Sequence, residues 1–437
     1  MRVLVVGSGG REHALCWKLR QSPDLTELYC APGNPGIGSV ADNLPIAAEE
    51  IHRLADFAAD LGIDLTVVGP ELPLTLGIVD EFQARGLPIF GPRRQAAELE
   101  GSKVFAKELM GRHGIPTADF RVAHDAGEAR RAAGELGMPV VLKADGLASG
   151  KGVMIVERAG DLDAALAAYF EERRFGAAGE RLVVEEHLEG EELSFIALTD
   201  GEGVLSLASS KDYKRIGEGD TGPNTGGMGA HSPSGILTGE QAARILETVV
   251  RPAVAGMAAE GRVFAGVLYA GLMLTAGGPR VLEFNVRLGD PEAQPLLMRL
   301  EEDLLPVLAA GARGRFETGR LHFRKEAAAC VVLANRGYPG KPSSGEEISG
   351  LESAGARPGV AVFHAGTAMR EGRLVAAGGR VLDVCATAPE LPGALRRAYE
   401  AAADIAWPSM VLRRDIGRRI LEGAAGLPRE EAGEEEG

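Results

Sequence analysis

The sequence contains few of the features that mark secreted, membrane-spanning or zinc-binding proteins. Only four of its 437 residues are cysteine, and they form no CxxC pair, which argues against a disulfide framework or a zinc cluster. No apolar run reaches the roughly 18 residues of a transmembrane helix. The N-terminus opens on a strand pattern, Arg2–Val6, where a signal peptide would begin with a basic and then an apolar region. We therefore expect a cytoplasmic protein that does not associate with membranes.

Basic residues are outnumbered by acidic ones. The 47 Lys and Arg residues stand against 62 Asp and Glu residues, a net charge of −15, which argues against a nucleic-acid partner. Part of this excess lies at 425–437, where five acids lie close together and predict a disordered tail. Lysine is scarce, with nine residues in all, yet five of them fall in the segments discussed below. A lysine kept in an arginine-rich sequence indicates a point charge for phosphate.

The first hundred residues alternate short apolar runs with amphipathic helical patterns. This order predicts βαβ crossovers and a parallel sheet, with ligands beyond the carboxyl ends of its strands. The expected strands are Val3–Val6, Leu25–Cys30, Leu65–Val68 and Pro88–Phe90, and the expected helices are Glu12–Arg20, Ile51–Leu61 and Leu74–Arg85. Glycine-bearing loops follow the first three strands and should meet at one edge of the sheet.

The rest of the chain predicts three further units, so the expected fold class is α/β and α+β multidomain. Residues 120–192 read β-α-β-β-α-β, typical of a compact lobe. Residues 193–326 carry strands and a long amphipathic helix over Gln241–Ala259, and residues 327–424 are rich in short strands. The predicted division is an α/β domain at 1–102, a central lobe at 103–122 and 193–326, a mobile lobe at 123–192, a β-rich domain at 327–424 and the tail at 425–437.

Two glycine-rich segments are suited to phosphate. Gly7–His13 follows a strand and precedes a helix, but Glu12 occupies the third glycine position of the dinucleotide fingerprint, so we exclude NAD. Backbone N–H groups at the helix start, with Arg11, can still bind one phosphate. Lys143–Val153 places two lysines and several glycines between two strands, an arrangement that favours phosphate contact although it is not a Walker A loop.

Three other segments carry candidate polar chemistry. Glu283 and Asn285 alternate along an apolar strand, and this carboxylate–amide pair suits a hard cation such as Mg²⁺, with Arg287 nearby to neutralise a transferring phosphoryl group. The acidic linker within Val183–Ser194 offers backbone groups for an adenine edge and an acid for a ribose hydroxyl. Ser210–Ala230 is predicted to be a long substrate-facing loop.

These motifs together resemble the glycinamide ribonucleotide synthetase family of the ATP-grasp superfamily. The resemblance covers about residues 1–420 in order. The stretches that carry it are Val3–Leu15, Ala31–Gly36, Val67–Pro73, Ile89–Pro92, Leu99–Lys107, Lys143–Val153, Asp220–Ala230, Tyr269–Leu272, Glu283–Glu292, Phe363–Gly366 and Gly378–Leu382. The resemblance implies a pre-ATP-grasp domain, a two-lobed ATP-grasp fold and a β-rich C-terminal domain. It also implies ligation of glycine to 5-phosphoribosylamine at the cost of ATP.

The resemblance also implies roles for individual residues. The implied ATP-binding set is Lys103, Lys143, Gly146, Ser149, Gly150, Lys151, Gly152, Glu185, Glu186, His187, Leu188 and Glu192. The implied substrate-binding set is Gly9, Gly10, Arg11, Glu12, Gly33, Asn34, Glu71, Asp212, Lys214, Arg215 and Asn224. Glu283 and Asn285 would bind Mg²⁺ or Mn²⁺, and Lys143, Arg287 and Asp290 would act at the reaction centre. We expect a monomer with small-molecule substrates.

Two alternatives remain open. A sister ATP-grasp enzyme could use formate or bicarbonate in place of glycine, and a non-catalytic module could bind ATP without turnover. One departure from the superfamily concerns the metal, since many members place a further acid on the strand before the one that bears Glu283. Here Gly266–Leu274 contains no acid, so either water or phosphate oxygens complete the coordination or a second metal binds weakly.

Overall fold

A computed structural model describes residues 1–147, 152–316 and 319–418. Within these residues no helix has both the length and the apolar character needed to cross a membrane. Ser149, Gly150 and Lys151 of the predicted ATP-binding set lie outside the described residues, as does the predicted acidic tail at 425–437.

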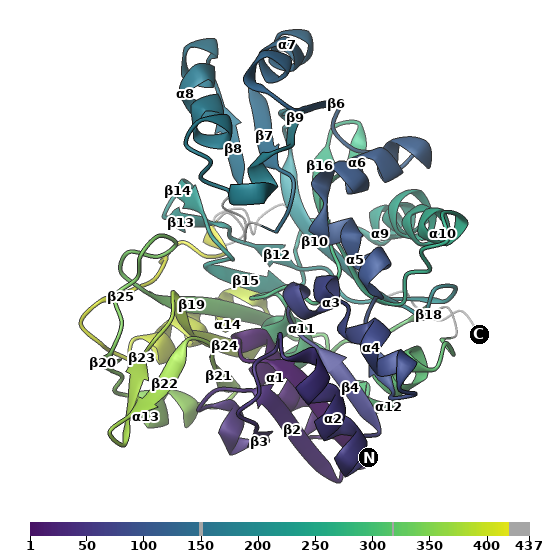
Figure 1. Ribbon diagram of the computed structural model, residues 1–437. Helices are drawn as coiled ribbons and strands as arrows, with labels where there is room; N and C mark the ends of the chain where they lie inside the picture. The colour runs from purple at the N-terminus through teal and green to yellow at the C-terminus, as the bar shows by residue number, and fades with distance from the viewer. Residues whose placement is uncertain (148–151, 317–318, 419–437) are drawn as a thin grey trace.

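The N-terminal region is a parallel sheet with strand order β3-β2-β1-β4-β5, drawn in purple and blue in Figure 1. The strands are β1 (Arg2–Gly7), β2 (Glu27–Pro32), β3 (Asp42–Asn43), β4 (Leu65–Val68) and β5 (Ile89–Phe90), and the helical segments are α1 (Gly10–Leu19), η1 (Ile37–Ser39), α2 (Ile51–Leu61), α3 (Glu71–Leu76) and α4 (Ile78–Ala84). The predicted parallel sheet is confirmed. The single helix predicted over Leu74–Arg85 is wrong, because Gly77 adopts a φ of +94° and separates α3 from α4.

A separate small lobe stands at the top of Figure 1. Its antiparallel sheet has the order β6-β9-β7-β8, and α7 and α8 pack against it through a small apolar core of their own. The elements are β6 (Phe120–Ala123), α7 (Ala126–Leu136), β7 (Val140–Ala144), β8 (Val153–Val156), α8 (Ala159–Phe170), η2 (Gly176–Gly179) and β9 (Leu182–Glu186). The predicted order β-α-β-β-α-β is confirmed.

The central region is built on a second sheet, with order β17-β16-β10-β11-β18. Its strands are β10 (Glu191–Thr199), β11 (Val204–Ser206), β16 (Gly266–Thr275), β17 (Gly278–Asn285) and β18 (Gly319–Arg320). Its helices are α5 (Arg94–Gly101), α6 (Lys103–Arg112), α9 (Gly239–Ile245), α10 (Arg251–Ala259), α11 (Ala293–Arg299) and α12 (Leu304–Ala312), with a π-helical segment, η3 (Leu246–Val250), joining α9 to α10.

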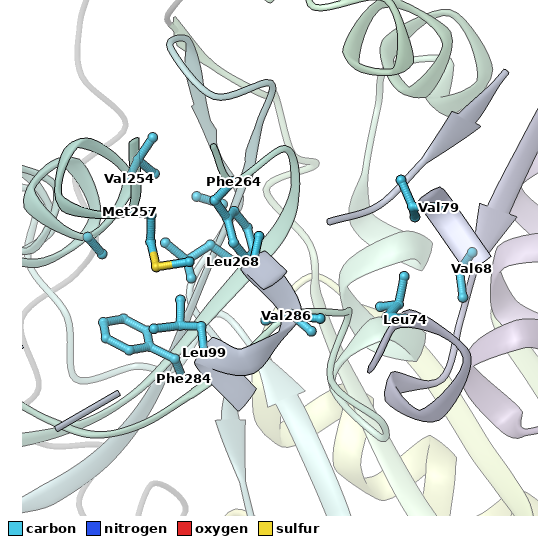
Figure 2. Close-up of a cluster of buried hydrophobic side chains, with 14 of the residues drawn as sticks. Val68, Leu74, Val79, Leu99, Val254, Met257, Phe264, Leu268, Phe284 and Val286 are labelled. Atoms are coloured by element: carbon cyan, nitrogen blue, oxygen red, sulfur yellow. The ribbon is translucent and has the colours of Figure 1, made fainter. Parts of the chain in front are cut away.

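The central and N-terminal regions share one hydrophobic core. Figure 2 shows Leu99, Met257, Phe264 and Phe284 of the central region, and the same buried cluster extends to Val68 in β4. Because apolar side chains from both regions exclude water together, separating the two would expose this surface. The N-terminal sheet is therefore held firmly against the sheet that bears Glu283.

The C-terminal region is rich in strands, as predicted, and forms a sheet with order β12-β15-β19-β24-β21. Its elements are β19 (Ala327–Asn335), β20 (Glu346–Glu347), α13 (Leu351–Gly355), β21 (Val360–His364), β22 (Thr367–Arg370), β23 (Arg373–Ala376), β24 (Arg380–Ala388), α14 (Leu391–Ala402) and β25 (Met410–Val411). Strand β25 pairs with β19, and β20, β23 and β22 form a small separate sheet. Strand β19 is buried along its whole length.

The long loop predicted over Ser210–Ala230 is wrong. This segment forms β12 (Lys211–Asp212), β13 (Arg215–Gly217) and β14 (Thr221–Asn224), and β15 (Gly229–Ser232) begins within it. Strands β13 and β14 make a hairpin, while β12 and β15 extend the C-terminal sheet. Strands this short and this rich in glycine lack the apolar alternation by which a strand is recognised.

Candidate active site

A cleft of about 540 Å³ lies where the small lobe, the central sheet, the N-terminal loops and the C-terminal region meet. It brings together most of the described residues of the predicted sites. Those that line it are Arg11, Glu71, Lys103, Lys143, Gly152, Glu185, Glu186, His187, Leu188, Glu192, Asp212, Lys214, Arg215, Asn224, Glu283, Asn285, Arg287 and Asp290. One cleft with this lining has the size of a nucleotide-binding site.

Two predicted phosphate-binding lysines approach the cleft from different elements. Lys103 is the first residue of α6, whose N-cap is Ser102, and its Nζ lies 3.3 Å from the carbonyl oxygen of Gly146. Lys143 ends near the floor of the cleft, where its Nζ donates to Glu185 Oε2 at 2.9 Å and to the Leu282 carbonyl at 2.9 Å. Because its partners come from two sheets, the ammonium group of Lys143 is fixed in place.

Lys107 is a buried cation that the sequence did not reveal. It lies one turn after Lys103 on α6, and its Nζ contacts Glu185 Oε2 at 3.0 Å and Thr117 Oγ1 at 2.7 Å. Burial lowers the pKa of Lys107 to about 8, although Glu185 opposes the shift. Glu185 Oε1 has no hydrogen-bond partner in the described part of the chain. The sequence feature that could have revealed Lys107 is its position four residues after Lys103, on an otherwise apolar helix face.

Glu283 and Asn285 lie near the end of β17, on the same face of the strand. Glu283 Oε1 is 3.5 Å from Lys214 Nζ, which is also 3.7 Å from Glu192 Oε2. Burial alone would raise the pKa of Glu283, but Lys214, followed by Lys103 and Lys143, outweighs it and holds the pKa at about 2. Glu283 is therefore a carboxylate at neutral pH, as a metal ligand must be.

The donor set fits a hard cation bound partly by water and phosphate. Gly271 of β16 pairs with Glu283, and no acidic residue occurs in β16. Among the described residues, no group of three or more His, Cys, Asp or Glu side chains is placed to hold a metal ion. A carboxylate and an amide oxygen suffice for a cation of the Mg²⁺ type, which keeps several waters and binds substrate phosphates.

Arg287 lies between two carboxylates that face the cleft. It is 3.3 Å from Glu71 Oε2 and 3.0 Å from Glu100 Oε1, and Glu100 Oε2 accepts the Val286 N–H at 2.7 Å. Burial favours a higher pKa for Glu71, yet Arg287 and then Arg11 lower it. Glu100 lies in α5, far from Arg287 in the sequence, and no local pattern predicts this contact. The pair of carboxylates orients the guanidinium of Arg287.

Asp212, Arg215 and Asn224 enter the cleft from the region of the β13–β14 hairpin. Arg215 pairs with Asn224 across the hairpin, and its Nη1 donates to the Gly222 carbonyl at 2.7 Å. Asp212 Oδ1 has no partner among the described residues. Burial, with Glu292 as the next cause, raises the pKa of Asp212 well above its usual range.

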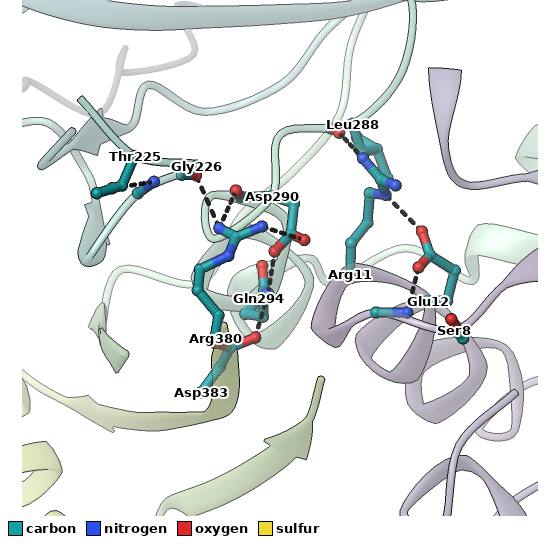
Figure 3. Close-up of polar contacts among 12 residues, drawn as sticks. Ser8, Arg11, Glu12, Thr225, Gly226, Leu288, Asp290, Gln294, Arg380 and Asp383 are labelled. Atoms are coloured by element: carbon teal, nitrogen blue, oxygen red, sulfur yellow. Dashed lines mark hydrogen bonds and ion pairs between the residues drawn. The ribbon is translucent and has the colours of Figure 1, made fainter. Parts of the chain in front are cut away.

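The N-terminal glycine loop lies at the edge of the cleft, and its groups bond mainly to one another. Glu12 accepts the Gly9 N–H at 2.6 Å and the Arg11 Nε–H at 2.5 Å, and Arg11 Nη1 donates to the Leu288 carbonyl at 3.1 Å (Figure 3). Asn34 Nδ2 donates to the carbonyls of Ser8 and His364. Of the predicted sites, Gly9, Gly10, Glu12, Gly33, Asn34 and Gly146 do not line the cleft.

Models of the three phosphoribosylglycinamide synthetase domains match the chain. The N domain matches residues 1–100, the ATP-grasp (A) domain residues 101–293 and the C domain residues 328–419. Among curated proteins, the phosphoribosylamine–glycine ligase of Rhizobium meliloti is 52% identical over 423 residues, which is 96% of this chain and 99% of that protein. The ligase of Brucella melitensis is 49% identical over 97% of this chain and 99% of its own length.

Solved structures also match the chain over most of its length. The crystal structure of phosphoribosylamine–glycine ligase from Thermotoga maritima superimposes with a TM-score of 0.82 at 35% identity, over 95% of this chain and 100% of that one. A biotin carboxylase from Campylobacter jejuni shares the fold, with a TM-score of 0.73 at 15% identity over 96% of this chain and 95% of that one. The chain therefore belongs to the phosphoribosylglycinamide synthetase (phosphoribosylamine–glycine ligase) family of ATP-grasp enzymes.

Proposed function

We propose that the chain catalyses the ATP-dependent ligation of glycine to 5-phosphoribosylamine, a step of purine biosynthesis that yields glycinamide ribonucleotide, ADP and phosphate. The observation that carries this proposal is the shared cleft, which is lined by Lys103 and Lys143 together with the Glu283–Asn285 pair and Arg287. Cations and a metal-ligand pair gathered in one cleft suit a bound triphosphate.

ATP would lie between the small lobe and β17. Lys103, Lys143 and the 146–152 loop would hold its phosphates, and the linker Glu186–Leu188 would present backbone groups to adenine. Glu192 would accept a ribose hydroxyl. In support, the linker joins β9 to β10 at the cleft, and Lys143 is held in place by Glu185 and the Leu282 carbonyl.

The reaction then needs two displacements. A glycine carboxylate oxygen bonds to the γ-phosphorus as the bond to the bridging oxygen of ADP breaks, giving glycyl phosphate. The amine of phosphoribosylamine next attacks the acyl carbon, phosphate leaves, and the nitrogen loses a proton. Arg287 would neutralise the charge on the moving phosphoryl group. Glu283 and Asn285 would hold Mg²⁺ or Mn²⁺, which when bound neutralises phosphate oxygens.

The second substrate would enter from the N-terminal loops. Gly9, Gly10, Arg11, Gly33, Asn34 and Glu71 would shape the place of its sugar phosphate, with Asp212, Lys214, Arg215 and Asn224 on the opposite side. Arg11 and Glu71 line the cleft beside Arg287, which puts this end next to the reaction centre. We also propose that the enzyme acts as a cytoplasmic monomer and that the 123–192 lobe closes over ATP.

An assay with three carboxylates tests the proposal. ADP release is measured with glycine, formate or bicarbonate, each with phosphoribosylamine, ATP and Mg²⁺. We expect turnover when glycine is the carboxylate and none with formate or bicarbonate. ADP release with formate or bicarbonate but not glycine would identify a sister enzyme, and ATP binding without any turnover would identify a non-catalytic module.

A further inference from the structure

Arg380 belongs to the C-terminal region, yet its guanidinium reaches the reaction centre. It is the first residue of β24 and lines the cleft. Its Nη2 contacts Asp290 Oδ2 at 2.7 Å, and its Nη1 donates to the Asp290 carbonyl at 2.6 Å and to the Gly226 carbonyl at 2.7 Å (Figure 3). One planar group thus joins two loops that enter the cleft from separate parts of the chain.

Tyr338 provides a second contact from the same region. Its hydroxyl accepts the Gly226 N–H at 2.8 Å, so the C-terminal region binds both the N–H and the carbonyl of Gly226. A Cβ on Gly226 would lie 3.0 Å from Arg380 Cζ, which leaves little room for a side chain at that position. The Gly226 loop is therefore fixed by two side chains, Arg380 and Tyr338, neither of which is among the predicted site residues.

The other oxygen of Asp290 is held by a relay into the C-terminal sheet. Gln294 Nε2 donates to Asp290 Oδ1 at 2.9 Å and to Asp383 Oδ2 at 2.7 Å. Asp383 is 1% exposed and lies in the middle of the sheet, opposite Val332 and Phe363. Both carboxylate oxygens of Asp290 thus have donors whose positions depend on the C-terminal region, so its orientation is set before substrate arrives.

This cluster is poorly built for stability alone. A partly buried Arg–Asp pair gains little over apolar packing of the same volume, and Asp383 Oδ1 and Gln294 Oε1 have no partner among the described residues. Buried polar groups left unpaired cost free energy and tend to occur where a site demands their geometry. Asp290 also faces the N-terminal glycine loop, since a Cβ on Gly9 would lie 3.5 Å from its Oδ2.

We propose that Arg380 is a positioning residue of the ligation, which fixes the Asp290 carboxylate and the Gly226 peptide beside the reacting groups. The inference rests on the proposed function. Arg380 acts through Asp290, so its loss should impair the chemical step more than nucleotide binding. Its three contacts do not include Lys103, Lys143 or Glu283.

Arg380→Gln tests the inference, with Arg373→Gln as the matched control. Arg373 lies on β23 in the same region, exposed and paired with Glu347. We expect Arg380→Gln to lower kcat about 100-fold, the size of effect that misplacement of a catalytic group produces, with the KM for ATP changed less than about threefold. Arg373→Gln should match the wild type.

Chemical rescue separates positioning from folding. Guanidinium ion added to Arg380→Ala should restore turnover about tenfold by refilling the site of the lost group, and it should do nothing for Arg373→Ala. If the Arg380 variants do not fold, Tyr338→Phe removes only one hydroxyl, and its kcat should fall about three- to tenfold, the value of one hydrogen bond.

Three outcomes would count against the inference. It is overturned if Arg380→Gln keeps kcat within about threefold of the wild type. It is also overturned if the loss of turnover equals the loss of folded protein and guanidinium restores nothing. If the Arg380 variants do not fold, full activity of Tyr338→Phe overturns it. Absence of glycine-dependent turnover in the wild-type protein would instead overturn the proposed function, and this inference with it.

Discussion

Glu283 illustrates how a single side chain can be committed to its charged form. Lys214, Lys103 and Lys143 act on it together and hold its pKa at about 2, against the effect of burial. In turn, Glu283 and Glu192 raise the pKa of Lys214 well above its usual value, although burial opposes this. Each residue of the pair thus keeps the other ionised before any metal or phosphate is bound.

Replacing Glu283 tests the proposed metal role. Glu283→Ala should leave the fold intact and lower turnover at saturating Mg²⁺ by more than about tenfold, or ~1.4 kcal/mol, because the cation loses its carboxylate ligand. Steady-state kinetics over a Mg²⁺ titration is the measurement. Glu347→Ala, on the exposed surface of the C-terminal region, is the control. A smaller loss of turnover would contradict the metal role.

Asp383 predicts a pH dependence of stability. Burial, and then the charge of Asp290, raises its pKa to about 7, whereas in an unfolded chain it is about 3.9. Between these values the unfolded chain has lost a proton that the folded chain keeps, so the wild type loses stability as pH rises from about 4 to about 7. The charged groups that face Asp383 are Asp290, Arg380 and Glu12, with the Gln294 amide.

Asp383→Asn cannot titrate and should lack this loss. The free energy of unfolding of the variant, relative to the wild type, should therefore rise between about pH 5 and about pH 8 by about 1–3 kcal/mol. Urea denaturation at the two pH values measures it. Identical pH dependence in both proteins would show that Asp383 is already ionised in the folded state at about pH 5.

At the scale of elements, helix α1 begins where three regions touch. A Cβ on Gly10, its first residue, would lie 1.7 Å from Asp383 Oδ2 and 2.9 Å from Gln294 Nε2. Contacts this short cannot exist, so only glycine allows α1, α11 and β24 to approach one another as they do. Gly10, which lies in the loop predicted to bind a phosphate, is therefore also needed for the packing of α1 against α11 and β24.

Gly10→Ala should therefore be strongly unfavourable. We expect a loss of about 1–3 kcal/mol in the free energy of unfolding, typical of overpacking, together with reduced activity. Gly134→Ala is the matched control, because Gly134 lies in α7 with nothing within 4 Å of its Cβ position. Alanine there should add up to about 1 kcal/mol through helix propensity. Urea denaturation compares the two, and equal stability would contradict the packing argument.

The elements that could be predicted from the sequence are those with a local signal. Apolar runs predicted β1 and β4 to within a few residues, and the pattern of residues 120–192 predicted the order of the strands and helices in the small lobe. The helix break at Gly77 was missed because a single glycine inside a periodic pattern does not reveal its positive φ. Strands β12 and β15 were missed because they are defined by pairing and not by their own residues: β15 pairs with β19, and β12 pairs with β15.

The candidate site divides in the same way. Lys143, Glu283 and Asn285 stand in segments whose local pattern carries their chemistry, and the cleft contains all three. Glu100, Tyr338 and Arg380 reach it through contacts that span up to 187 residues of sequence. No pattern in a single sequence reveals such contacts, so these three residues could be assigned to the site only from the folded structure.

At the scale of the whole molecule, the small lobe meets the rest of the described chain through polar contacts, among them those of Lys143 with the Leu282 carbonyl and of Lys107 with Glu185. Asp145 Oδ1 accepts from Ser102 Oγ at 2.9 Å and from the Val104 N–H at 3.1 Å, and Arg280 Nη1 lies 2.6 Å from Glu186 Oε1. Its apolar core is separate from the core that the N-terminal and central regions share. A lobe with its own core can rotate without exposing the larger one.

We expect the 123–192 lobe to close when nucleotide binds. Limited proteolysis should cleave the 146–152 loop less readily with ATP and Mg²⁺ than without, because closure would cover it. Cleavage in the exposed turn at 371–372, between β22 and β23, should not change and serves as the internal control. Equal cleavage of the loop in both conditions would contradict closure.

The strands β12 and β15 have a practical consequence for protein engineering. They carry residues from 211–232 into the sheet of β19 and β24, so the last hundred residues are not a detachable module. In a chimera that takes residues from 327 onward from a relative, the relative's β19 would have to pair with β15 of this chain. Recombination designs should therefore exchange 211–232 together with that segment, and the two should be inherited as one block in any library of hybrids.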